Sequence, residues 1–286
     1  MGRGFNLVSL PRNPNPQVDN SPFRLKVAPT MEILHFEIIG APIPNRSSTE
    51  DIEFLGLIYL QKVANATTGE GMHVEPGLWL NMPDLTIARL GTIPHGDSLL
   101  AQGDVLDFIP GPPPIQKIDP APFKLDPNTG QRINVSDPVL SAVFTNASTN
   151  PPAGVTAGLI ADPNSLLQDD INTLASSQRK IIKTDILFVS SNPIGGINGT
   201  RMVAPTPQPS PTAPSAPPPD PTGGIVNIPF IRLNANAMSL SAIFWIETIQ
   251  NPDGHESMQL QYTQTVILDF DDIKWPHISV ATLIKQ

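Results

Sequence analysis

The chain has 286 residues, of which 40% are hydrophobic and 15% charged, with a formal net charge of −9 and no cysteine. The acidic balance leaves no basic patch to neutralise phosphates, so we expect neither nucleic acid nor an anionic membrane surface as a partner. The absence of cysteine excludes disulfides, zinc–thiolate sites, iron–sulfur clusters and cysteine nucleophiles.

Short runs rich in Ile, Leu, Val and Phe occupy the first 109 residues. Gly, Pro, Asn and Asp separate these runs, which span 31–39, 51–64, 73–82, 85–93 and 98–108. Apolar runs of this length between turn-forming residues predict β-strands.

The middle of the chain, residues 110–224, is rich in proline. Stretches such as "PTPQPSPTAPSAPPPDP" lack backbone donors and favour extended polyproline II, so we expect an irregular insertion with a Pro-rich linker at 203–222. Within the insertion, "NSLLQDDINTLASSQ" (164–178) predicts one short helix with Asn164 as its N-cap. "IIKTDILFVSS" (181–191) predicts one more strand, a candidate for pairing with the strands of the flanks.

Four further strand-like runs follow the insertion, at 225–235, 239–250, 258–270 and 277–285. In the third, Gln259 and Gln261 alternate with Leu260 and Tyr262, which places one row of side chains inside and one row outside. "NPDG" at 251–254 predicts a hairpin turn.

About nine strands at hairpin spacing, with one helix, predict an all-β antiparallel sandwich or barrel. We expect a single domain over 1–286, with a core from 1–109 and 225–286 that the insertion 110–224 interrupts. Because neither flank can bury its strands alone, the two flanks must fold together.

Five histidines are the main candidates for chemistry. His35 lies within a strand and His255 follows the predicted hairpin turn, so both are expected to be exposed or structural. His95 lies in a turn between strands and could reach the mouth of a barrel. His277 shares one face of the last strand with small residues such as Ser279, which leaves room for a ligand beside the imidazole. Spacing alone favours a half-buried structural histidine over a ligand.

Four short blocks carry a family pattern. They are "MGRGF" with Gly2 and Gly4, "MEILHFEIIGAPIP" with Glu32, Leu34, Phe36, Gly40 and Pro42, "GEGMHVEPGLWL" with Gly69, His73, Glu75 and Gly77, and "HISVATLIK", which begins at His277. In the order and spacing of these blocks the chain resembles the nitrobindin family, heme-binding β-barrels of the calycin group that are shaped like fatty-acid-binding proteins. The family's opening tryptophan has no counterpart here, and neither has the insertion.

The resemblance implies an antiparallel up-and-down β-barrel of about ten strands. The long irregular Pro-rich insertion, which carries one short helix, is an addition to that barrel. It implies that His277 is the axial ligand of a ferric heme b in an apolar cavity, with nitric oxide or peroxynitrite handling as the activity. If the protein is an enzyme, the resemblance implies a heme-dependent peroxynitrite isomerase or a peroxidase-like activity. Candidate aromatic walls of the cavity are Trp79, Phe244 and Trp245. Secondary ligand candidates are His73 and His95.

Two alternatives stay open. A heme-free barrel that carries a small apolar ligand needs the cavity but not His277. A structural or assembly protein would use the Pro-rich insertion to contact its partners. No apolar run approaches the roughly 20 residues that span a bilayer, so we expect a soluble protein without a transmembrane segment, with the cytoplasm slightly favoured.

Overall fold

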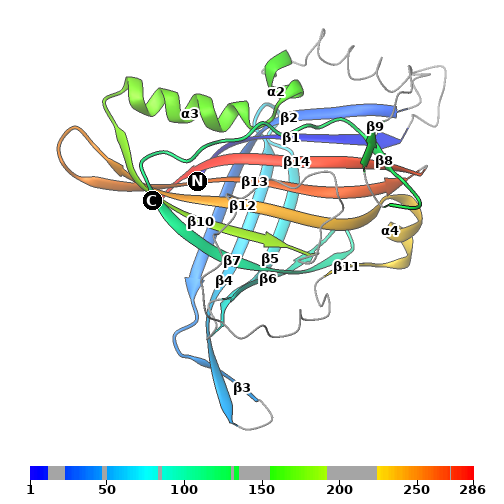
Figure 1. Ribbon diagram of the computed structural model, residues 1–286, viewed down its shortest axis with the longest axis horizontal. Helices are drawn as coiled ribbons and strands as arrows, with labels where there is room; N and C mark the ends of the chain where they lie inside the picture. Colours follow the sequence, from blue (N-terminus) through cyan, green and yellow to red (C-terminus); the bar gives the residue numbers. More distant parts are fainter. Residues whose placement is uncertain are drawn as a thin grey trace.

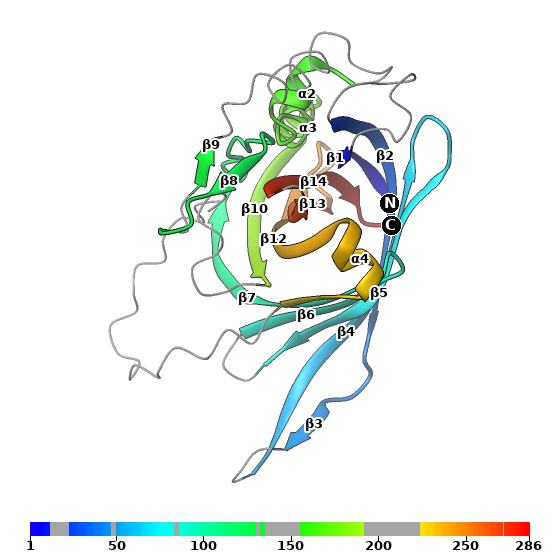
Figure 2. The same cartoon turned by 90° about the vertical axis from the view of Figure 1, so that its right-hand side faces the viewer.

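A computed structural model describes residues 1–11, 23–46, 50–82, 86–129, 132–134, 155–191, 224–270 and 272–286. Ten of its strands form a closed ring (Figures 1 and 2). The ring strands are β1 (Gly2–Pro11), β2 (Phe23–Ile38), β4 (Asp51–Asn65), β5 (Gly71–Asn81), β6 (Thr86–Ile93), β7 (Asp97–Pro110), β10 (Lys180–Ser190), β12 (Asn236–Gln250), β13 (Glu256–Phe270) and β14 (Ile273–Ile284).

Every neighbouring pair in the ring is antiparallel, and the last strand, β14, pairs with β1 to close it. Closure removes the unpaired strand edges that would otherwise invite aggregation. This topology confirms the predicted all-β, antiparallel up-and-down barrel.

Local turn chemistry connects β12 to β13. The backbone N–H of Asn251 donates to the carbonyl of His255 over 2.9 Å, and Gly254 has a φ of 85°, a conformation that glycine adopts without steric cost. The hairpin predicted from "NPDG" is therefore confirmed.

The alternation of side chains produces two apolar clusters on opposite faces of the barrel wall. The inner cluster joins strands from across the ring and includes Leu99, Leu240 and Tyr262. The outer cluster includes Ile278 and Leu7, both 0% exposed, and packs beneath the helices of the first excursion. Each aliphatic side chain buried in this way contributes roughly 1.5–3 kcal/mol.

Two excursions leave the ring, instead of the single insertion expected from the sequence. The first, between β7 and β10, holds β8 (Phe123–Leu125), β9 (Arg132–Asn134), α2 (Ala157–Ala161) and α3 (Ser165–Ser176). The second, between β10 and β12, holds β11 (Gly224–Asn227) and α4 (Pro229–Asn234). A short strand, β3 (Ile43–Arg46), pairs with β4 beyond the ring.

The barrel takes one strand from the range 110–224 that the sequence assigned to the insertion. β10 lies between β7 and β12 and pairs with both, as proposed for residues 181–191. The apolar residues of β10 explain this placement, because Ile186 packs in the outer cluster and Val189 in the inner one. The Pro-rich linker at 203–222 lies outside the described residues.

The helices differ from the prediction in two ways. α3 matches the predicted helix, but its N-cap residue, Asn164, makes no capping bond. The Asn164 side chain instead donates to the carbonyl of Gln116 and accepts from Thr263, which ties the helix to the barrel. The run 225–235, predicted as one strand, divides into β11 and α4, because Pro229 suits the first turn of a helix and cannot donate within a ladder.

α4 crosses one end of the barrel (Figure 2). Its position follows from a hydrogen bond of 2.9 Å from Ile228 N–H to the carbonyl of Gly96, in the turn between β6 and β7. Among the described residues, no helix is long and apolar enough to cross a membrane.

Candidate functional site

His277 faces the inside of the barrel from β14. The Asn6 Nδ2 atom lies 2.9 Å from His277 Nε2 and 2.9 Å from Ser279 Oγ. Asn6 reaches this position because β1 and β14 pair with Asn6 opposite Ser279. The pKa of His277 is lowered to about 4. Burial is the main cause, and the nearby imidazoles of His73 and His95 contribute to the same shift. The ring is therefore neutral at pH 7.

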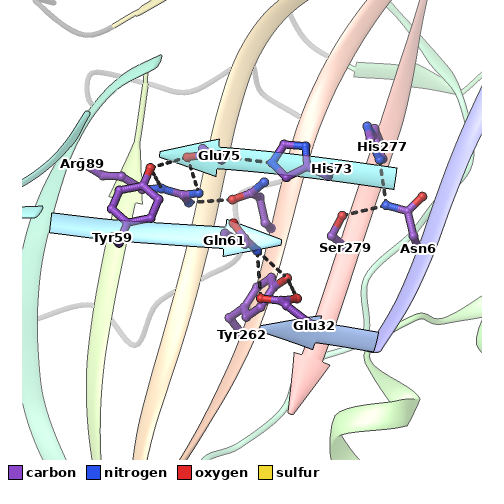
Figure 3. A network of polar contacts seen from close by, with 11 residues as sticks. Asn6, Glu32, Tyr59, Gln61, His73, Glu75, Arg89, Tyr262, His277 and Ser279 are labelled. Carbon is purple, nitrogen blue, oxygen red and sulfur yellow. Dashed lines mark hydrogen bonds and ion pairs between the residues drawn. The ribbon is translucent and has the colours of Figure 1, made fainter. Parts of the chain in front are cut away.

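His73 and His95 lie at the same end of the barrel as His277. Their ring centroids are 5.5 Å apart in an edge-on arrangement, with His73 on β5 and His95 in the turn between β6 and β7. His73 lies between His277 and the interior carboxylate of Glu75 (Figure 3), and its Nε2 is 3.2 Å from Glu75 Oε2. The fold thus brings together the three histidines that the sequence singled out as site candidates.

A buried ion pair forms the centre of the interior network. Glu75 and Arg89 are 0% and 2% exposed, and Arg89 Nη2 donates to Glu75 Oε1 over 2.8 Å. Arg89 also donates to Tyr59 and to Gln264, over 3.2 and 2.6 Å, and the Tyr59 hydroxyl donates to Glu75. These contacts leave the guanidinium nitrogens and the carboxylate fully engaged.

The ion pair determines the charge of both groups. Burial alone would raise the pKa of Glu75, but the Arg89 guanidinium and the hydrogen bonds from His73 and Tyr59 lower it to about 2. Burial alone would lower the pKa of Arg89, but the Glu75 carboxylate raises it above its ordinary value. Both groups therefore stay ionised inside the barrel at neutral pH.

A second buried carboxyl group, Glu32, lies beside this network. It accepts hydrogen bonds from Gln61 Nε2 over 2.9 Å and from the Tyr262 hydroxyl over 2.6 Å (Figure 3). Burial raises the pKa of Glu32 above its ordinary value, and the two donors oppose that shift. Gln61 also donates to the Tyr262 hydroxyl, so three strands share one polar cluster.

Aromatic rings line the interior next to the ion pair. The ring centroid of Phe244 is 5.2 Å from that of Trp79 and 5.6 Å from that of Tyr262, and the Arg89 guanidinium lies 5.7 Å from the Trp79 centroid. Trp79 and Phe244, two of the candidate aromatic walls, therefore occupy the interior. Trp245 does not, because it follows Phe244 on β12 and so points outward into the cluster beneath the helices.

Sequence reasoning found some residues of the network and missed others. Glu32, His73 and Glu75 belong to the quoted family blocks, and the structure shows that all three belong to the interior network. Arg89 and Tyr59 were missed, because neither belongs to a recognised motif. An arginine within the apolar run 85–93 was an available signal, because a charged side chain inside a buried strand requires a partner.

The site can be compared with what an iron ligand requires. A neutral imidazole that faces the interior meets the requirement of a metal ligand. Its Nε2 lone pair already accepts from Asn6, so ligation through that atom requires the Asn6 amide to move aside. No group of three or more His, Asp or Glu side chains within the described residues is arranged to hold a metal ion on its own. Within the described residues, the site therefore offers a metal one imidazole nitrogen, Nε2 of His277, once Asn6 has moved.

Comparisons with known proteins add little. No protein-family model matches the chain, and no curated protein matches its sequence. Among solved structures, the crystal structure of Rv2717c from M. tuberculosis is similar at a TM-score of 0.41 and 10% identity, over 100% of this chain and 92% of that one. Because this similarity is so low, the barrel is assigned from the strand pairing alone.

Proposed function

We propose that this protein is a ligand-binding β-barrel, that its site is the end of the interior where His73, His95 and His277 converge, and that its ligand is heme b with His277 as the axial ligand. The observation that most directly supports this proposal is the neutral, inward-facing imidazole of His277. A barrel interior filled only for stability would be apolar, because buried ionisable groups rarely stabilise more than apolar groups of the same shape.

The residues of the chain would take distinct roles. The imidazole of His277 would be the iron ligand, and Asn6, which also donates to Ser279, would have to release Nε2. Trp79 and Phe244 would offer apolar surface to the porphyrin. When bound, heme would supply a ferric iron able to take nitric oxide or a related oxidant, which makes peroxynitrite isomerisation the activity to test.

The heme-free carrier is less well supported. Carriers of fatty acids need a cation free to meet the ligand carboxylate, and the interior guanidinium of Arg89 is already paired with Glu75. An uncharged apolar ligand remains compatible with the interior cluster. The assembly alternative depends on the Pro-rich linker, which lies outside the described residues.

Hemin titration tests the proposal. Wild-type protein should develop a Soret band shifted from that of free hemin. His277→Ala should weaken binding by at least about tenfold, the loss that even an outer hydrogen-bond partner of a metal ligand causes. His255→Ala is the matched control, because His255 is exposed beside the β12–β13 hairpin and should leave the titration unchanged.

Two results would count against it. Equal hemin affinity in wild type and His277→Ala would remove the axial assignment. Displacement of an apolar dye by an uncharged lipid, with no spectral response to hemin, would leave the barrel as a carrier.

A further inference from the structure

The helix α3 rests on the barrel through polar contacts that leave several oxygen atoms without donors. It packs on the outer side of the barrel, against β14 and β10, and Figure 1 shows it above the ring strands. The Gln261 Nε2 atom on β13 donates to the Leu167 carbonyl of α3 and to Thr282, each over 3.0 Å. At the start of the helix, Thr263 donates to Asn164. The interface is thus built from amides and hydroxyls as well as from apolar side chains.

Three acceptor atoms in this interface meet no donor among the described residues. They are Oδ2 of Asp170, Oε1 of Glu247 and Oε1 of Gln261. Asp170 is 8% exposed, and Glu247 and Gln261 are 0% exposed. Native structures rarely leave buried acceptors without a partner, so each such atom calls for an explanation.

The orientations of these groups are determined by their other contacts. The Leu167 carbonyl can only accept, so the Gln261 amide must present its nitrogen there and its oxygen elsewhere. The other oxygen of Glu247, Oε2, accepts from Gln259. The other oxygen of Asp170, Oδ1, accepts from Arg3. Oε1 of Gln261 and Oδ2 of Asp170 are therefore acceptors, and so is Oε1 of Glu247 when that carboxyl group is ionised.

The strand register and the helix place these oxygens in one region. Glu247 is paired with Gln259 across β12 and β13, and Gln261 is two residues further along the same face of β13. Asp170 lies on α3 about one turn after Leu167, whose carbonyl accepts from Gln261. Gln259, which donates to Glu247, and Thr282, which accepts from Gln261, line one pocket with Asp170. Burial raises the pKa of Glu247 to about 7.

A pocket of about 550 Å³ opens beside this cluster, between α3 and the outer face of β13, β14 and β1. Its lining includes Arg3, Asp170, Gln259 and Thr282. The pocket reaches the same carboxylate that carries an unpartnered oxygen. Solvent and small ions therefore have a route to Asp170 and to the side chains that contact Glu247 and Gln261.

We propose that a hard cation of the calcium class binds between α3 and the barrel, with Asp170, Glu247 and Gln261 as its protein ligands and water from the adjacent pocket completing the shell. Calcium accepts carboxylate and amide oxygens together and tolerates irregular geometry, whereas magnesium demands a near-ideal octahedron. One cation would satisfy all three acceptors and compensate the carboxylate of Glu247 together with that of Asp170, which Arg3 already contacts. A single proton on Glu247 would satisfy only one acceptor.

Thermal unfolding of the full chain at pH 8 tests this site, in EDTA and in CaCl2, MgCl2 or NaCl at matched ionic strength. Calcium at about 100 times its dissociation constant should raise the wild-type Tm by roughly 5 °C. Asp170→Asn and Glu247→Gln should lose that response. Asp169→Asn is the matched control, because Asp169 is exposed on the same helix and should keep the response.

Glu247→Gln also shows that a lost response is not lost folding. Its new amide nitrogen can donate to Oδ2 of Asp170, so this variant should unfold in EDTA at a Tm equal to or above that of wild type in EDTA. Calorimetric titration with CaCl2 should give binding heat for wild type and Asp169→Asn only.

The proposal is overturned if wild type has the same Tm in EDTA and CaCl2 and gives no binding heat. If the Tm is the same with and without calcium but falls as the pH rises from 6 to 8, and Glu247→Gln removes that fall, then Glu247 binds a proton where the cation was proposed. If the Tm depends on neither calcium nor pH, an ordered water molecule is the partner of these oxygens.

Discussion

The interior carboxylate of Glu75 depends on Arg89, and replacing Arg89 with methionine should destabilise the barrel by about 3–5 kcal/mol, the usual cost of stranding a buried charge. Both side chains are almost fully buried, and Arg89 Nη2 is 2.8 Å from Glu75 Oε1. Methionine preserves much of the arginine volume but offers no charge and no N–H donor. The substitution therefore isolates the electrostatic role.

The pKa of Glu75 gives an independent magnitude. Its pKa of about 2 in the fold, against an ordinary value of 4.5, corresponds to roughly 3 kcal/mol of stability at neutral pH. Because the folded pKa lies below the unfolded one, this stability is present above pH 4.5 and is lost as the pH falls toward 2. Without Arg89, burial should raise the pKa of Glu75 above 4.5 and reverse that dependence.

Urea unfolding at pH 7 measures the effect. Asp185→Asn is the matched control, because the Lys183–Asp185 pair is 2.8 Å long but 44% and 35% exposed, and its loss should cost about 0–1 kcal/mol. Removing both interior charges in Glu75→Gln/Arg89→Met should cost less than Arg89→Met alone, since no carboxylate is then stranded. If Arg89→Met unfolds within about 1 kcal/mol of wild type, the ion pair does not hold the interior as argued.

Two further predictions concern the barrel wall. The pKa of His277 is about 4 in the folded protein and ordinarily 6.5, so the neutral ring contributes its full stability above pH 6.5, and up to about 3 kcal/mol is lost as the pH falls to 4. In His277→Gln the urea midpoint should therefore depend less on pH between 6.5 and 4. Equal pH dependence in wild type and variant would contradict this. A Cβ on Gly103 would overlap the Phe188 carbonyl oxygen, whereas one on Gly71 would meet nothing within 4 Å. Gly103→Ala should therefore cost at least about 1–3 kcal/mol in thermal unfolding and Gly71→Ala almost nothing, and equal Tm values would show that β7 and β10 do not approach so closely.

The sequence by itself determined where most of the strands run and which side chains along a strand share a face. Alternation with period two separates Gln261 from Tyr262, because neighbouring side chains on a strand point to opposite faces. It also determined the β12–β13 hairpin, whose turn chemistry is contained in four consecutive residues. These features are local, so short stretches of sequence suffice to specify them.

Tertiary structure alone decided which face is the interior and which side chains meet there. Tyr262 donates to Glu32 across a separation of 230 residues, and Asn6 meets His277 across 271. Such contacts depend on the register of every strand between them and on the closure of β14 onto β1, which no local pattern encodes. For the same reason the outward direction of Trp245 and the position of β10 between β7 and β12 became visible only in the closed barrel.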